Sequence, residues 1–221
     1  VSAENGERFR ARTLIIAAGA WNGSLASQLG ITLPFTVTRE AVAYFQPLPD
    51  AGTPSHSMHS MPAFIPDYFA DDGHEVYVLP QIARPKDALL QTQDHTGIKA
   101  GLMWQGLVLH TPNEIAHPPP DPEAQEAYVN HLRTAIRTYF AHVSHTEREV
   151  VRCLYTTTPD TDFVVDCVPG HSNIVLLGGF SGHGFKFGPA IGEAAADLVL
   201  GASPQVPLQR FALDRFNEAP Q

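Results

Sequence analysis

The sequence predicts an α/β fold with α+β character, and three observations support this. A polar segment around Asn5-Gly6 leads into the apolar run Thr13–Ala20, which is typical of a hairpin followed by a buried strand. Segments with period-two alternation are separated by Pro, Gly and Asp clusters, which indicates a mostly antiparallel sheet. Later in the chain, apolar residues recur at helical spacing. The alternating segments are Thr36–Phe45, Glu75–Leu79 and Ile98–Leu109.

Composition and charge narrow the class of protein. With 221 residues, 43% hydrophobic and 17% charged, the chain can form one large domain or two small ones around a real core. Lys and Arg total 14 against 23 Asp and Glu, giving a net charge of −9. This charge disfavours nucleic acids and acidic surfaces as partners. The apolar runs fall far short of the roughly 20 residues that a bilayer-spanning helix needs, so we expect no membrane partner.

Cysteine usage favours a reducing compartment. Cys153 and Cys167 cannot form a disulfide framework, and no CxxC metal knuckle is present. The sequence has no basic and apolar leader at Val1, and its last residues, Ala219-Pro220-Gln221, are not a peroxisomal signal. We therefore expect a cytoplasmic location, and we expect the chain to be a fragment.

Capping residues predict the helices. Asn22 is expected to cap a short helix over Gly23–Leu29, with Gly30 as its C′ residue. Asp121-Pro122-Glu123 is typical of an N-cap, a first-turn proline and a first-turn acid, and predicts a helix to about His142. Its apolar stripe favours a core face over a binding face. The stripe comprises Tyr128, Leu132, Ala135, Ile136 and Phe140. A separate segment, Pro47–Asp72, is expected to be irregular.

The richest segment for chemistry is Asn173–Ala196. Strands are expected at Glu149–Tyr155, Phe163–Val165 and Asn173–Gly178, and the last leads through the loop Gly178–Gly184 into a helix over about Lys186–Leu200. Unpaired backbone N–H groups at such a helix start can stabilise an electron-rich ligand. A plain glycine-rich turn is an equal alternative. A serine-hydrolase elbow is excluded, because His183 stands where that motif requires glycine.

The residue pattern leaves the role of Cys153 open. It lies on a strand expected to pair near the glycine-rich loop, but most cysteines on strands are small buried hydrophobic residues. The same reading applies to Cys167. Two histidine pairs, His56 with His59 and His142 with His145, have metal-like spacing but no converging carboxylate or cysteine set, so we expect no metal site.

Longer motifs carry a resemblance. RCLYTTTPDTDFVVD followed by HSNIVLLGGFSGHGFKFGPAIGEAAADL closely resembles the C-terminal part of the monomeric sarcosine oxidase family, which comprises FAD-dependent amine oxidoreductases of the D-amino-acid-oxidase superfamily. IIAAGAWNGSLASQLGITLP is similar to that family's FAD-contacting strand and helix. The resemblance implies part of a Rossmann-like FAD-binding domain in residues 1–34 and 149–221, with an antiparallel substrate-binding domain in residues 35–148.

The resemblance also implies a cofactor site. Cys153 would be bonded through its sulfur to the 8α carbon of the flavin, which should raise the flavin's reduction potential. Cys167 matches no such motif and is expected to be a packing residue. The other residues implied to contact FAD come from the two resembling segments and are Gly19, Trp21, Gly182, His183, Gly184, Phe185 and Lys186.

Substrate residues follow from the same resemblance. Lys186 would pair with the substrate carboxylate, and Tyr77 and Tyr155 would line the pocket. Lys99 resembles the lysine that lies near flavin N5 through a water and promotes reaction with oxygen, because a positive charge in a dry pocket stabilises forming superoxide. The alternative for Lys99 is a solvated strand lysine.

Two departures from the family pattern concern the substrate. Sarcosine oxidases have an active-site histidine four residues after the oxygen lysine, whereas this chain has Met103, followed by Trp104. The connection from Pro80 to Lys99 is also longer. We therefore expect a preferred substrate other than sarcosine.

The preferred hypothesis is an FAD-dependent oxidase of a secondary or N-substituted amino acid, with hydride transfer to flavin, imine hydrolysis and reduction of oxygen to hydrogen peroxide. The sequence contains no GxGxxG after an N-terminal strand, so roughly the first two fifths of the protein, with the arginine that would share the carboxylate with Lys186, are expected to be absent. One alternative is a non-catalytic fragment or partner subunit. Another is a dehydrogenase that passes electrons to a carrier.

Overall fold

The computed structural model describes residues 1–49, 56–65, 75–82 and 97–216. These form two compact units. The first unit comprises residues 1–38, 109–117 and 155–221, and the second comprises residues 39–108 and 118–154. The strands β2 (Thr36–Pro47) and β6 (Val143–Thr157) each continue from one unit into the other. The functional domain boundaries implied by the family resemblance stay a prediction.

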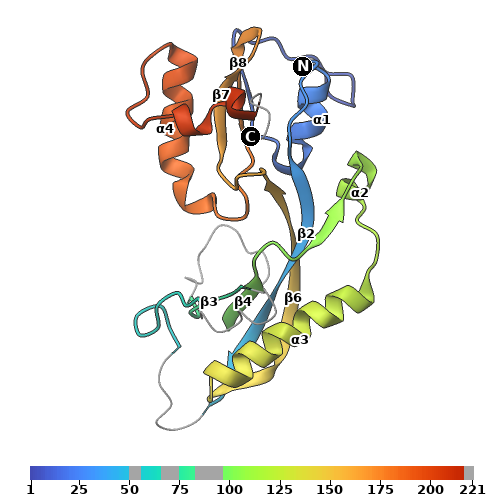
Figure 1. The fold of residues 1–221 in the computed structure, drawn as a ribbon, viewed down its shortest axis with the longest axis vertical. Coiled ribbons are helices and arrows are strands. Elements are labelled where there is room, and N and C mark those ends of the chain that lie inside the picture. Colours follow the sequence, from blue (N-terminus) through green and yellow to red (C-terminus); the bar gives the residue numbers. More distant parts are fainter. Residues whose placement is uncertain (50–55, 66–74, 83–96, 217–221) are drawn as a thin grey trace. The chain divides into compact units, whose positions relative to one another are not determined.

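The first unit is built on a sheet with the order β1-β8-β7. β1 (Leu14–Ile16) runs parallel to β8 (His171–Gly178), and β8 pairs antiparallel with β7 (Val164–Val168). Alternate residues of β7 enter separate apolar clusters, because successive side chains of a strand point to opposite faces. Val164 packs with Leu213, whereas Val165 packs with Ile191 of α4 (Gly188–Leu200), the helix beside this sheet in Figure 1.

The predicted strand Thr13–Ala20 is shorter and less buried than expected. It ends at Ile16, and a 3₁₀ turn over Gly19–Trp21 follows, entered through a left-handed Gly19 with a φ of 55°. Ile15 is 45% exposed, because β1 has β8 as its only partner among the described strands. The expected hairpin is present, with an antiparallel bridge between Ser2 and Arg8.

The first helix differs from the prediction at its start. α1 spans Asn22–Ser27, and Trp21 rather than Asn22 is its N-cap, without a side-chain cap bond. The Asn22 side chain instead bonds the backbone at two other places, described below. Gly30 lies past the helix end with a φ of 76°, as its predicted role requires.

The second unit contains most of an antiparallel sheet with the order β3-β4-β2-β5, in which β6 also pairs with β2. β3 spans Val76–Leu79, β4 spans Ile98–Leu102 and β5 spans Leu107–Leu109. The predicted strand Ile98–Leu109 is therefore two strands, separated by a turn in which Trp104 has a left-handed φ of 55°. In the segment expected to be irregular, described residues form isolated bridges, including Phe64 to Val78.

The long helix α3 (Pro122–Tyr139) covers the core of the second unit, as its apolar stripe predicts (Figure 1). Asp121 is its N-cap and accepts a hydrogen bond from the Ala124 N–H at 3.1 Å. The buried Tyr128 hydroxyl accepts from the Leu102 N–H at 2.8 Å and donates to the Ala41 carbonyl at 2.6 Å. One tyrosine thus fixes the helix against both β2 and β4.

A short helix, α2 (Pro112–Ala116), is present where the sequence analysis predicted none. A capping box holds its first turn, with the Glu114 N–H donating to Thr111 Oγ1 and the His110 N–H donating to the Glu114 carboxylate. The Thr-Pro-Asn-Glu sequence was the available signal.

Towards the other end of the chain, the helix α4 begins at Gly188 rather than at the predicted Lys186, after a 3₁₀ turn over Phe185–Phe187. Within the described ranges, no helix has the length and apolar character needed to span a membrane.

Candidate functional site

The first unit brings two glycine-containing loops to one edge of its sheet. β1 and β8 are parallel, so their carboxyl ends meet at the same edge. Gly19 follows β1, and the loop Gly178–Gly184 follows β8. The crevice outside the carboxyl ends of parallel strands is the usual ligand site of open α/β sheets. The sequence predicted cofactor residues in both loops, and the topology places both loops together.

Asn22 joins these two loops. Its side chain accepts a hydrogen bond from the Ala18 N–H at 2.7 Å and donates one to the Leu177 carbonyl at 2.8 Å, and the residue has 0% exposure. The Asn22 amide occupies the space beside Gly178, where a Cβ would collide with it. Glycine is therefore required at Gly178 by packing, because no other residue leaves room for this bridge.

The glycine-rich loop is held in a strained conformation by the buried Ser181. This residue has a left-handed φ of 51°, uncommon for a residue other than glycine. Its N–H donates to the Thr156 carbonyl at 2.9 Å, and its hydroxyl donates to the Gly179 carbonyl at 3.0 Å. These bonds tie the loop to the end of β6, and strain held in this way is common at ligand sites.

The next residue of the loop, Gly182, packs against Tyr155. A Cβ at Gly182 would stand 2.6 Å from Tyr155 Cδ2, closer than real contacts permit. Gly182 also has a φ of 79°, so both its backbone and its surroundings require glycine. The loop glycine therefore positions a predicted pocket tyrosine.

The remaining predicted cofactor residues of the first unit are accessible to different degrees. Phe185 is fully exposed, and Gly19 and Trp21 are also exposed. His183 is half-buried against Phe163, and its Nδ1 lies 3.0 Å from the Ser181 carbonyl. A Cβ at Gly19 would meet no heavy atom within 4 Å, whereas one at the half-buried Gly184 would collide with Phe180. The open backbone at Gly19 fits a cofactor approaching closely at this edge.

Lys186 is exposed and locally anchored. Its Nζ donates to the His183 carbonyl at 3.0 Å and lies 5.1 Å from the centroid of the Phe187 ring. Neither contact neutralises the charge. The ammonium is thus available to an anionic group such as a carboxylate.

The second unit places Lys99 beside Tyr77. The antiparallel register pairs Lys99 of β4 with Leu79 of β3, and Gly101 with Tyr77. Lys99 Nζ lies 5.8 Å from the centroid of the Tyr77 ring. Burial lowers the pKa of Lys99, and the neighbouring Cys153 opposes that shift. Lys99 is half-buried, which favours the site role over a solvated strand lysine, and that role stays a prediction.

Cys153 lies on β6, where the charges of Lys99 and Glu40 act on its thiol. Burial raises the pKa of its thiol, the carboxylate of Glu40 raises it further, and Lys99 lowers it. A hollow of about 300 Å³ opens beside Cys153, lined also by Arg39, Pro118, Arg152 and Leu154. Cys153 thus borders a space that could receive the edge of a ligand.

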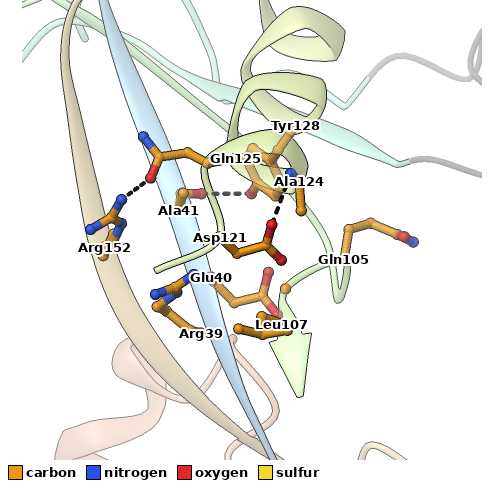
Figure 2. Close-up of a pocket in the computed structure, with 11 residues that line it drawn as sticks. Arg39, Glu40, Ala41, Gln105, Leu107, Asp121, Ala124, Gln125, Tyr128 and Arg152 are labelled. Carbon is orange, nitrogen blue, oxygen red and sulfur yellow. Dashed lines mark hydrogen bonds between the residues drawn. The ribbon is translucent and has the colours of Figure 1, made fainter. Parts of the chain in front are cut away.

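A second cavity in this unit was not predicted from the sequence. It has a volume of about 40 Å³, enough for a water molecule, and lies between the start of α3 and the strands (Figure 2). Glu40, 1% exposed, lines it with Arg39, Asp121 and Arg152, and Arg152 donates to the Gln125 side chain. The signal was the pair Arg39-Glu40, the only charged residues in β2.

Other predicted positions have these locations. Met103 is half-buried directly after β4, and its N–H donates to the Glu75 carbonyl at 2.9 Å. Most of the Pro80–Lys99 connection lies outside the described residues. Cys167 is half-buried on β7 and is a free thiol, as is Cys153.

The histidines pair differently from their sequence spacing. Burial lowers the pKa of His56, and the neighbouring His142 lowers it further. His56 also contacts the Phe140 ring, with 6.1 Å between centroids. Among the described residues there is no group of three or more His, Cys, Asp or Glu side chains placed to hold a metal ion.

Known proteins resemble this chain over nearly its whole length. The family model described as FAD dependent oxidoreductase matches residues 1–198. The monomeric sarcosine oxidase of Streptomyces avermitilis is 34% identical over 222 residues, covering 99% of this chain and 51% of that protein. The N-methyl-L-tryptophan oxidase of Citrobacter koseri is 30% identical over 225 residues, with the same coverage of 99% and 51%. The chain therefore spans about half the length of these relatives.

Solved structures share the fold. Iminodiacetate oxidase from Chelativorans sp. BNC1 matches with a TM-score of 0.66 at 18% identity, covering 96% of this chain and 48% of that one. Glycine oxidase from Geobacillus kaustophilus matches with a TM-score of 0.65 at 15% identity, covering 96% and 47%. At these identities the likeness concerns the fold, and it confirms the predicted mixture of helices with parallel and antiparallel strands.

Proposed function

Because the chain belongs to the FAD dependent oxidoreductase family, we propose that it forms part of a flavin-dependent oxidase acting on a secondary or N-substituted amino acid. The relatives named as sarcosine and N-methyl-L-tryptophan oxidases support this substrate class. The observation that carries the proposal is the open hollow beside Cys153 on β6, at the position where the resemblance implies flavin attachment. Lys99, on β4 of the same sheet, is close enough to Cys153 for their charges to interact.

The chemistry that a flavin would supply when bound is removal of a hydride from the carbon of the amine C–N bond and two-electron reduction of oxygen to hydrogen peroxide. In the first unit, Gly19, Trp21 and the residues Gly182 to Lys186 are proposed to hold the flavin, because the sheet topology gathers both loops at one edge. In the second unit, Cys153 would attach it covalently. The hollow that Cys153 borders supports this attachment.

Recognition of the amino acid is assigned to three side chains. The exposed ammonium of Lys186 would bind the carboxylate, since its present partners are a carbonyl and an aromatic ring. Tyr155 and Tyr77 would line the pocket. Each ring packs so closely against a glycine that a Cβ on that glycine would collide with the ring. The two tyrosine rings are thus held by packing before a substrate binds.

Lys99 is proposed to supply the positive charge for the reaction with oxygen. A charge in a partly buried position acts through a lower effective dielectric than a charge in water. Its ammonium would therefore stabilise the negative charge that develops on oxygen. The burial that lowers the pKa of Lys99 also strengthens this interaction.

The experiment follows both half-reactions in the flavin-loaded protein. Mixing with N-methyl amino acids without oxygen should bleach the flavin absorbance, and admitting oxygen should restore it with one peroxide per turnover. Bleaching without peroxide would favour a dehydrogenase. A protein that binds no flavin under any loading condition would instead be the non-catalytic fragment or partner subunit.

Substrate preference is proposed to lie away from sarcosine. Met103 is a thioether that cannot transfer a proton, and it follows the strand that carries Lys99. Comparing kcat/KM for sarcosine with that for N-methyl amino acids bearing larger apolar side chains tests this directly. A higher value for sarcosine would contradict the assignment.

A further inference from the structure

Gly101 and Tyr77 form a close cross-strand pair in the second unit. The register places Tyr77 of β3 directly opposite Gly101 of β4, so both positions share one face of the sheet. A Cβ built at Gly101 would stand 2.6 Å from Tyr77 Oη, 2.7 Å from Cζ and 2.9 Å from Cε1. The hydroxyl end of the ring therefore lies directly over the glycine.

The backbone itself does not require glycine at this position. Gly101 lies in a regular strand and is not among the residues with positive φ. Its neighbour across the strand is the reason no side chain fits. This separates Gly101 from Gly182, where a φ of 79° would strain any substitution in addition to the contact with Tyr155.

The ring that crosses Gly101 also contacts Lys99. Lys99 is paired with Leu79, two residues along β3 from Tyr77, and its Nζ lies 5.8 Å from the ring centroid. A cation within about 6 Å of an aromatic ring is attracted to its face, most strongly where water is partly excluded. The position of the Lys99 ammonium thus depends on the ring, and the position of the ring depends on the missing Cβ.

We infer that Gly101 is a positioning residue, which by lacking a side chain lets Tyr77 lie across β4 and hold the Lys99 ammonium in place. This inference rests on the proposed function for its consequence in the reaction with oxygen. Its structural part, the dependence of Tyr77 on Gly101, stands on the contacts alone. Gly101 acts through Tyr77 and Lys99 and touches no reacting atom.

The test is a double-mutant cycle of Gly101→Ala and Tyr77→Ala in the flavin-loaded protein. Gly101→Ala should slow flavin reoxidation at least ten-fold. Once the ring has been removed by Tyr77→Ala, adding Gly101→Ala should change the rate less than two-fold, because the clash has gone. Gly192→Ala is the matched control, since a Cβ there meets no heavy atom within 4 Å.

A second measurement separates this inference from the proposed function. With 3-fluorotyrosine incorporated into the same protein, the fluorine resonance of Tyr77, assigned by its loss in Tyr77→Phe, should move in Gly101→Ala and stay in place in Gly192→Ala. If the Tyr77 resonance moves in Gly101→Ala but the protein shows no flavin chemistry, the proposed function is wrong and the positioning of Tyr77 by Gly101 is still supported.

Three outcomes overturn the positioning role: an unmoved resonance, an equal effect of Gly101→Ala with and without the Tyr77 ring, or an unchanged reoxidation rate in an active oxidase. If Gly101→Ala does not fold, the double variant should restore folding. Failure of that rescue also overturns the inference.

Discussion

The side-chain amide of Asn22 donates a 2.8 Å hydrogen bond to the carbonyl of Leu177, and its oxygen accepts from the Ala18 N–H. The bond joins the loop after β1 to the strand that leads into the glycine-rich loop. Both loops contain predicted cofactor residues. The relation between them therefore depends on one buried side chain.

Replacing the small side chain of Asn22 should lower the free energy of unfolding substantially. Asn22→Ala leaves the Ala18 N–H and the Leu177 carbonyl without this partner in a buried place, which costs about 2–3 kcal/mol of unfolding free energy. Urea denaturation measures the change. Asn5→Ala, on an exposed turn, is the control and should change stability by less than about 0.5 kcal/mol. Equal losses in the two variants would contradict the bridging role.

Covalent flavin attachment should depend on one cysteine. Cys153→Ser should release the flavin into the supernatant on acid precipitation, whereas Cys167→Ser should keep a yellow pellet. The two residues are a matched pair, because both are half-buried free thiols on strands. Retention of acid-stable flavin by Cys153→Ser would refute attachment at that sulfur.

Removing the charge of Lys99 should affect one half-reaction. Lys99→Met should slow flavin reoxidation by two decades or more, about 3 kcal/mol in the barrier, and leave flavin reduction nearly unchanged. Stopped-flow absorbance measures both rates. Lys186→Met is the contrasting variant and should mainly raise the KM for the amino acid. An equal loss in both half-reactions of Lys99→Met would exclude the assigned role.

The reoxidation rate should also depend on pH with a definite sign. Lysine is charged below its pKa, and burial lowers the pKa of Lys99 from its usual value near 10.4. The rate should therefore be high at neutral pH and fall as the pH rises through the lowered pKa. A pH series in the wild-type protein should show this step. Its persistence in Lys99→Met would assign the titration to another group.

A carboxylate of the second unit should contribute to acid stability. Glu147 on β6 binds Arg133 of α3 through two hydrogen bonds of 2.7 and 2.6 Å, and these bonds lower the pKa of Glu147. A lowered carboxyl pKa adds stability that is complete above the usual value near 4.3 and is lost as the pH falls through the lowered value.

Glu147→Gln should consequently cost about 1–2 kcal/mol at pH 7 and progressively less at acidic pH. Thermal melts between pH 7 and 3 check this. Glu4→Gln, in the exposed turn near the start of the chain, serves as the control for removing one carboxylate. A difference between Glu147→Gln and wild type that is constant across this range would argue against the linkage.

The chain's local patterns determined where most elements lie. Asp121-Pro122-Glu123 and the apolar stripe that follows specify α3, because capping bonds and helical spacing are local properties of the sequence. The alternation in β2 and β3, and the apolar run of β8, likewise predicted strands close to their observed bounds. Two predictions were wrong: the strand Thr13–Ala20 is shorter, and Ile98–Leu109 is two strands. The helix α2 was missed. Each of these features depends on neighbouring segments or on a weak local signal.

The sequence by itself identified the residues that carry the family's motifs, among them Lys99, Cys153 and Lys186, because residue types in a fixed order do not depend on contacts. Only the tertiary structure brought Lys99 into the environment of Cys153, gave Asn22 its two partners and put the Tyr77 ring over Gly101. Except for the local bond between Ala18 and Asn22, these relations join segments far apart in the chain. Strand register and parallel pairing decide them, and no local pattern encodes either one.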